Sequence, residues 1–170
     1  MAAPAFGLSE QNGASTGTDT DSITSIVFAS VDQNSNTASL ATNNPITAGN
    51  NSYEKYNRLK VTTAASNSLS AFGVYFSATA PTDQASSSAF ITMKYAANPS
   101  YTAPVATTSS VATSLCSADT SAPGTTITAP ANTVSSFSGY FCQQMQTTSS
   151  ATGGNVTFAS PWTSVGYTYS

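Results

Sequence analysis

The stretch from Leu69 to Pro81 constrains the fold most, because it is the densest apolar run in the chain. Phe72, Val74 and Phe76 recur at every second position, the spacing that places side chains on one face of a β-strand. Pro81 has no backbone N–H to donate and ends the run. The run therefore predicts a central strand, against which other strands bury their apolar faces.

Other short runs of alternating or β-branched residues, separated by turn residues, predict further strands. These are Ser22–Val31, a short strand around Leu40, Tyr53–Thr63, Ala89–Ala96, Thr133–Thr147, Val156–Ala159 and Thr163–Tyr169. We expect Tyr53–Thr63 to form a hairpin with the central strand. The pattern predicts an all-β fold, a β-sandwich or jelly roll of about seven to eight strands.

The composition supports this prediction. Ser and Thr make up about a third of the chain, and Phe and Tyr together contribute sixteen residues. Strand-forming residues are therefore common, whereas Leu, Glu, Lys and Arg, which favour helices, are scarce. Charged residues are only 6% of the chain, so its surface is poorly protected against association. Such a surface suits a protein that is packed into an assembly.

Residues 1–21 predict an extended N-terminal arm in front of a single β-sandwich domain over residues 22–170. The arm is rich in Gly, Ala, Ser and Thr, and only Phe6 and Leu8 are possible apolar anchors. We expect it to be flexible alone and ordered against a partner through these two residues, or to be a tail without a role.

The sequence carries no catalytic, metal or cofactor signature. It has no histidine, which removes Ser-His-Asp and Cys-His catalysis, and it has no glycine-rich phosphate loop. Seven carboxylates leave an acid/base pair conceivable, but most lie beside turn residues or in the arm. The segment 32–36 resembles half of a calcium loop, yet Thr37 stands in the glycine position, which favours a turn. We expect no enzyme and no cofactor.

Charge and cysteine content limit the environment. A net charge of −3 with four basic residues favours no nucleic-acid partner. No basic and apolar leader precedes the first strand, and no apolar run is long enough for a membrane helix. We therefore expect synthesis in a cytosol and no membrane contact. Cys116 and Cys142 are either reduced and semi-buried or joined after exposure to an oxidising medium.

Three of the four basic residues, Lys55, Arg58 and Lys60, lie within six positions. They are either a solvated sheet face that protects an edge or a docking patch for an acidic partner surface. Tyr167 and Tyr169 suit carbohydrate stacking, although strand residues of one parity are more often part of a core.

Four segments, in this order, carry a resemblance to a known group of proteins. They are Phe72–Pro81, Tyr101–Val105, Ser109–Ala112 and the end of the Ser/Thr-rich hairpin, Gly166–Tyr169. Together they resemble the small β-sandwich virion proteins of tailed bacteriophages, over about residues 55–170. Such proteins serve as decoration (cement) proteins on capsids or as related head and tail surface proteins.

The resemblance implies a non-enzymatic virion protein on the capsid surface, made in the host cytoplasm. Its partner would be the major capsid protein, bound where capsid subunits meet, and the oligomer would be a homotrimer. The alternative is a head or tail fibre module that binds a host carbohydrate. A third interpretation, a secreted or surface-layer β-domain, needs a non-classical export route.

Overall fold

The structure is a computed structural model of the chain and describes residues 3–14, 16–65, 69–76, 91–115, 125–151 and 163–169. Within these residues the regular secondary structure consists of antiparallel β-strands and one four-residue helix, α1 (Leu40–Asn43), joined by irregular segments. The predicted all-β fold is therefore confirmed. No described helix is long and apolar enough to cross a membrane.

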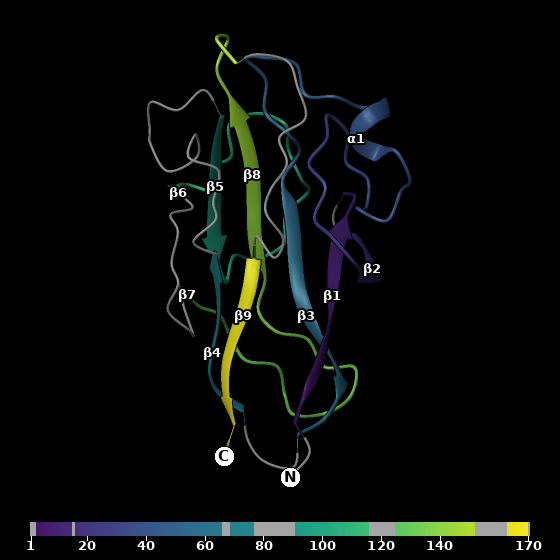
Figure 1. The fold of residues 1–170 in the computed structure, drawn as a ribbon, viewed down its shortest axis with the longest axis vertical. Coiled ribbons are helices and arrows are strands. Elements are labelled where there is room, and N and C mark those ends of the chain that lie inside the picture. Colours follow the sequence, from purple (N-terminus) through teal and green to yellow (C-terminus); the bar gives the residue numbers. More distant parts are fainter. Residues whose placement is uncertain are drawn as a thin grey trace.

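The strands form two sheets (Figure 1). The large sheet has the order β2-β1-β3-β8-β5-β6, with β2 (Thr18–Ile23), β1 (Ala5–Asn12), β3 (Lys55–Thr63), β8 (Phe141–Thr147), β5 (Ile91–Ala97) and β6 (Ser114–Leu115). The small sheet has the order β7-β4-β9, with β7 (Thr125–Thr126), β4 (Leu69–Phe76) and β9 (Thr163–Tyr169). β1 begins and β9 ends at the same end of the molecule (Figure 1).

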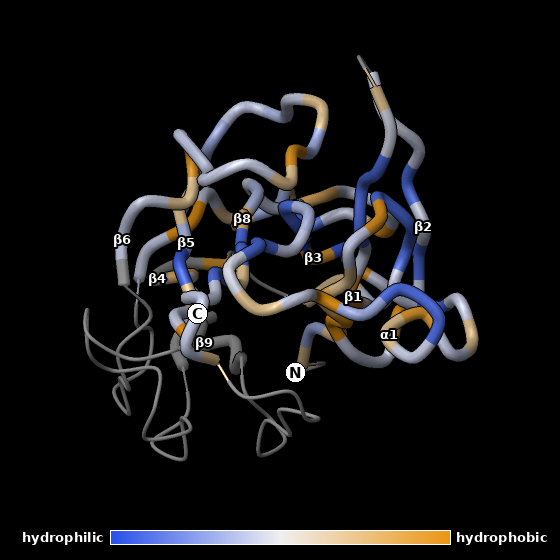
Figure 2. Tube along the Cα trace, turned by 90° about the horizontal axis from the view of Figure 1, so that it is seen from above, coloured by the Kyte–Doolittle hydropathy of each residue, from blue (hydrophilic) through white to orange (hydrophobic). Residues whose placement is uncertain are grey.

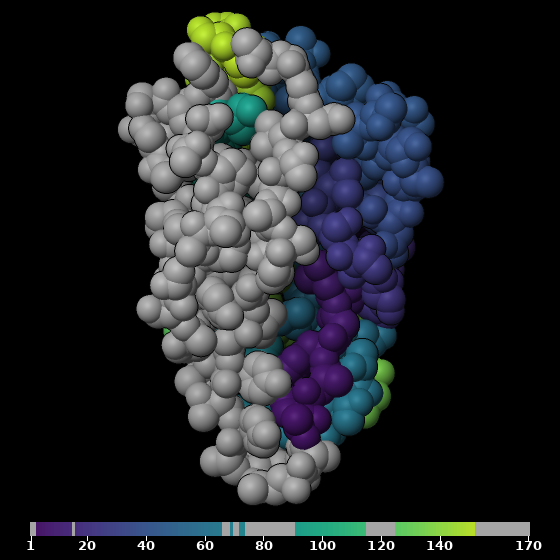
Figure 3. Space-filling model, viewed as in Figure 1, coloured from purple at the N-terminus to yellow at the C-terminus, as the bar shows by residue number. Residues whose placement is uncertain are grey.

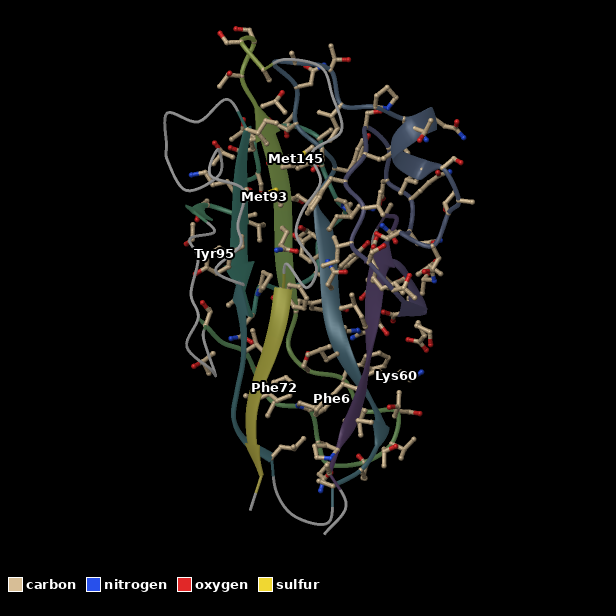
Figure 4. The ribbon with its side chains drawn as sticks, viewed as in Figure 1. Phe6, Lys60, Phe72, Met93, Tyr95 and Met145 are labelled. Carbon is tan, nitrogen blue, oxygen red and sulfur yellow. The ribbon has the colours of Figure 1, made fainter. Side chains whose placement is uncertain are left out.

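The two sheets pack through an apolar cluster formed by β3, β4 and β8 and by Ile127. Its buried members are Leu59, Phe72, Ile127 and Phe141. A second cluster combines Phe28 and Met93 with part-buried neighbours that include Tyr95 and Met145. Figure 4 shows Phe6 and Phe72 in the lower half of the molecule and Met93, Tyr95 and Met145 in the upper half.

A third cluster lies on the opposite face of the large sheet, because neighbouring residues of a strand point to opposite faces. Tyr56 and Cys142 are paired across β3 and β8, both are fully buried, and they pack with Ala112. The large sheet is therefore covered on both faces, by the small sheet on one side and by irregular chain that includes Ala112 on the other.

Several predicted strands are confirmed, with changes in position. β4 is the middle strand of the small sheet, and Phe72 is only 2% exposed, while the side chains of Val74 and Phe76 lie outside the described part. β5 and β9 match the predicted runs closely. Of the predicted strand 133–147, the part from Phe141 onward forms β8. The predicted strand 156–159 lies outside the described residues.

The structure differs from the prediction of a flexible N-terminal arm. Residues Ala5–Asn12 form β1, which pairs on one side with β2 and on the other with β3. β1 is an interior strand of the large sheet, and its last four residues are buried. The segment orders because β3 supplies a complete set of main-chain partners within the same chain. On the face shown in Figure 3, the N-terminal residues (dark purple) lie in the lower half of the molecule beside residues in the teal of β3, the strand with which β1 pairs.

Three local predictions were also wrong. β3 and β4 do not form a hairpin, because β3 pairs with β1 and β8 whereas β4 pairs with β7 and β9. The predicted strand 22–31 is mostly irregular, since β2 ends at Ile23. The residues at Leu40 form α1 rather than a strand, with Leu40 buried.

Candidate functional site

Phe6 and Leu8, the two expected anchors of the arm, point into the protein. Both pack against the apolar cluster of Leu59 and Phe72, and the rings of Phe6 and Phe72 meet edge to face at 5.3 Å between centroids. Their burial against the protein's own core, rather than against a partner, accounts for the order of β1. Both side chains are part-buried, and the contacts described above lie within the chain.

Lys55 is likewise no part of an exposed basic patch. Its side chain is fully buried, and its Nζ donates a 2.9 Å hydrogen bond to Glu10 Oε1, also fully buried. The Lys55 ammonium also donates a 2.5 Å hydrogen bond to the carbonyl oxygen of Gln33. A buried charge is tolerated only when it is paired and hydrogen-bonded, and Lys55 meets both conditions.

Glu10 is the centre of a buried polar group that we call the Glu10–Lys55 cluster (Glu10, Asn12, Ser35 and Lys55). Glu10 Oε1 also accepts a 3.0 Å bond from Asn12 Nδ2, and Oε2 accepts a 2.5 Å bond from Ser35 Oγ. Asn12 Nδ2 donates further to Asp32 Oδ1 at 2.9 Å, but Asn12 Oδ1 is buried and has no hydrogen-bond partner. Within β1 and β3, the strands that carry Glu10 and Lys55, hydrophilic residues (blue) occur beside hydrophobic ones (orange) (Figure 2).

Two neighbouring amides on the same face of the large sheet are also buried with unpaired atoms. Gln143, opposite Lys55 in the register, has neither its oxygen nor its nitrogen paired, and Asn57 Oδ1 is unpaired. Both residues are fully buried. Buried polar atoms without partners are uncommon, so their concentration around Lys55 marks this part of the interior as unusual.

A second buried network, by contrast, is fully connected. Gln144 donates through Nε2 to the carbonyl oxygens of Ser52, Val105 and Thr107 and accepts from the backbone N–H of Ser109. The hydroxyl of Ser109 in turn donates to Glu54. These bonds attach the irregular chain around residues 105–109 to the large sheet, which is a structural role.

Arg58 and Lys60 remain at the surface, but each is paired within the chain. Arg58 forms an ion pair with Asp19 and Lys60 forms one with Asp21, both from the edge strand β2. Their side chains are 18% and 26% exposed. The hydrogen bonds from Lys60 and then from Ser9 hold the pKa of Asp21 below its ordinary value of 3.8.

Aromatic rings surround the Arg58 guanidinium and complete a feature that we call the β3 surface patch (Arg58, Lys60, Phe137 and Tyr140). The guanidinium carbon lies 3.9 Å from the ring centroid of Phe137 and 4.8 Å from that of Tyr140. Both rings are part-buried. The patch thus combines paired charges with partly exposed aromatic faces, a surface able to bind through stacking and hydrogen bonds.

Tyr101 and Tyr56 extend this aromatic group into the interior. Their centroids lie 5.1 Å apart, and Tyr101 also contacts Tyr140 at 6.0 Å. Burial, followed by the nearby Asp32 carboxylate, raises the pKa of Tyr101 to about 12. Burial likewise raises the pKa of Tyr56 and Tyr140, so all three phenols are neutral hydrogen-bonding groups.

The described residues contain no group of three or more His, Cys, Asp or Glu side chains placed to hold a metal ion. Cys142 is a free, buried cysteine, and burial raises its thiol pKa, whereas Cys116 lies outside the described residues. The side chains of Tyr167 and Tyr169, named for carbohydrate stacking, also lie outside the described part.

Sequence reasoning missed Glu10 and Asn12, which the structure makes central. A signal for them existed, because Phe6, Leu8, Glu10 and Asn12 share one parity and therefore one face of a strand. The polar composition of the second half of that series concealed it.

Comparisons of the chain with protein-family models, curated proteins and solved structures found no match.

Proposed function

We propose that the protein is a non-enzymatic structural protein of a tailed-bacteriophage virion that decorates the outer surface of the capsid. Its partner would be the major capsid protein, and it would be made in the host cytoplasm before joining the head. One observation carries this proposal: the chain uses three of its four basic side chains in internal ion pairs. These basic side chains stabilise the fold, as is expected of a structural component of an assembly.

The proposal also rests on what remains at the surface. With few unpaired charges, the outside of the described part offers mainly hydroxyl and amide groups, which neither repel nor steer a neighbour electrostatically. Binding would then depend on shape and on local stacking. Of the expected docking residues, Lys55 is fully buried, whereas the basic side chains of Arg58 and Lys60 keep exposed area and lie in the β3 surface patch.

Copy number tests the location. Purified particles are separated on a denaturing gel, and the band is measured against that of the major capsid protein. A decoration protein gives hundreds of copies per particle, whereas a fibre gives tens or fewer. Absence from particles would contradict any virion role. The homotrimer is tested separately by light scattering, which measures the molar mass of the free protein.

The contact surface is tested with charge variants. Arg58→Gln together with Lys60→Gln should weaken binding to undecorated capsids, because it removes the two cationic groups that lie over the Phe137 ring and so changes the stacking surface of the patch. Lys94→Gln is the matched control, since Lys94 is basic, lies on β5 and forms no ion pair among the described residues. Equal binding of both variants would move the contact elsewhere on the protein.

A fibre module that binds a host carbohydrate is a second candidate, favoured by the part-buried rings of Tyr101, Phe137 and Tyr140 beside a paired guanidinium. Sugar rings stack on aromatic faces, and hydroxyls bond to charged planar groups. Binding to a glycan array that is lost on Phe137→Ala, together with a low copy number, would favour this candidate over decoration.

A further inference from the structure

Three side chains that can react with one another meet in the Glu10–Lys55 cluster: a primary amine, a carboxamide and a carboxylate. Glu10 Oε1 touches both nitrogens, Lys55 Nζ at 2.9 Å and Asn12 Nδ2 at 3.0 Å. The β1–β3 register pairs Gln11 with Tyr56, so the next pair along the two strands places Asn12 opposite Lys55. Amine and amide therefore face each other across neighbouring strands, with the carboxylate between them.

We propose that Lys55 and Asn12 become joined by an intramolecular isopeptide bond, with Glu10 as the catalytic residue that transfers the protons. The bond would tie β1 covalently to β3 inside the protein. This inference is independent of the proposed virion function, because it depends on three side chains within one chain.

The reaction balances without any co-reactant. The Lys55 ammonium passes one proton to the Glu10 carboxylate, and the free amine then attacks the Asn12 carboxamide carbon. A bond forms between Lys55 Nζ and Asn12 Cγ, and the bond between Asn12 Cγ and Nδ2 breaks. The protons return through Glu10 to the departing nitrogen, so that ammonium leaves and Glu10 ends as a carboxylate.

The surroundings of Asn12 favour loss of its nitrogen. Asn12 Nδ2 lies between two carboxylates, Glu10 Oε1 at 3.0 Å and Asp32 Oδ1 at 2.9 Å, which stabilise positive charge on it as it departs. Water that would compete with the amine is excluded, since Glu10 and Lys55 are fully buried.

The positions of the other two reacting groups are fixed by the chain between Gln33 and Ser35. Lys55 Nζ donates to the Gln33 carbonyl oxygen at 2.5 Å, and Ser35 Oγ donates to Glu10 Oε2 at 2.5 Å. Groups whose positions are fixed around a shared partner in this way react as if at very high concentration. The same contacts explain why a lysine is buried here at all.

One competing reaction gives the same loss of mass. Asn12 precedes Gly13, and in such a pair the glycine nitrogen can attack the Asn side chain to form a succinimide, also with loss of ammonia. Here the Gly13 backbone N–H donates to Asp32 Oδ2 at 2.8 Å, which directs it away from this attack. The experiment nevertheless has to separate the two products.

Intact-mass spectrometry of the folded, purified full chain is the first test. We expect a mass below that of the sequence by about 17 Da, the mass of one ammonia molecule. A chain that keeps the full mass after prolonged incubation in the folded state would overturn the proposal.

Peptide mapping identifies the product. Trypsin should fail to cut after Lys55, and chymotrypsin, which cuts after Phe28, should release two joined peptides that carry Asn12 and Lys55. Normal tryptic cleavage after Lys55 together with the mass loss would indicate the succinimide and overturn the proposal. Fragment spectra that join Lys55 to Asn57 would also overturn the assignment to Asn12.

Two variants complete the test. Glu10→Gln keeps the shape of the side chain but cannot accept the proton, so it should keep the full mass and be cut after Lys55. Asn57→Ser changes a neighbouring buried amide that bonds to the Lys55 carbonyl oxygen, and it should still lose the ammonia. Bond formation in Glu10→Gln at the rate of the unchanged chain would overturn the role of Glu10.

Discussion

The two halves of strands β1 and β3 contrast sharply, although they share one face of the same sheet. At one end, Phe6, Leu8 and Leu59 pack with Phe72 of the small sheet. At the other end, the same face carries Glu10 and Lys55, which are buried as deeply. One half is held by apolar contact and the other by directed bonds.

The contrast shows what each half demands of the rest of the chain. Apolar side chains need only a complementary shape, because the hydrophobic effect has no direction. Buried charges need partners at fixed positions, and here irregular chain supplies them through Gln33 and Ser35. The segment after β2 is therefore as necessary to the polar half as β4 is to the apolar half.

The largest effect is expected in the apolar half. Phe72→Ala should lower the free energy of unfolding by about 3–5 kcal/mol, because it removes a ring that is 2% exposed and leaves a cavity beside Phe6. Denaturant titration followed by circular dichroism measures it. The control Val134→Ala, at a side chain 61% exposed, should change stability by less than about 0.5 kcal/mol. Equal losses in both would contradict the packing described.

The polar half should respond to a broken pair rather than to lost area. In an Asn12→Ser background, which cannot form the isopeptide bond, Lys55→Met should cost about 3 kcal/mol, because it leaves the buried Glu10 carboxylate unpaired. Replacing both partners, with Glu10→Leu and Lys55→Met, should recover most of this loss. If the double replacement is as unstable as the single one in the same titration, an unpaired charge is not the cause.

The smallest effect belongs to the surface pair on the opposite face of β3. The pKa of Asp21 is lowered in the folded protein, so its ion pair with Lys60 stabilises the fold fully at pH values above its ordinary pKa of 3.8. This stabilisation is lost as the pH falls through the lowered pKa of the folded protein. Asp21→Asn should cost less than about 1 kcal/mol at neutral pH, since the pair is solvent-screened. The difference from the unchanged chain, measured by urea titration at several pH values, should vanish in acid. A difference that persists there would assign the effect to packing.

The contrast also explains which parts of the fold the sequence predicted. Alternation of Ile91, Met93 and Tyr95 predicted β5, because apolar side chains at every second position have few other solutions. The same reasoning failed at β1, where Glu10 and Asn12 occupy inward positions that the pattern assigns to apolar residues. The partner that permits this, Lys55, is far away in the chain, and no local pattern reveals a contact of that separation. Lys55 was wrongly placed in a basic surface patch for the same reason.

The position of β8 between β3 and β5 has a consequence for biosynthesis. Gln143 of β8 is paired with Lys55 of β3 on one side and with Tyr95 of β5 on the other. β8 is synthesised after both of these strands and supplies main-chain partners to each of them. A nascent chain can pair β1 with β3 early, but one edge of β3 then stays open until β8 has left the ribosome. Open strand edges pair with other chains, and pairing between strands far apart in the sequence is slow. The period before β8 pairs with β3 is therefore the one in which aggregation is expected. Chains truncated before Phe141 should therefore aggregate, and a chaperone that shields nascent strands should raise the yield of the 170-residue chain.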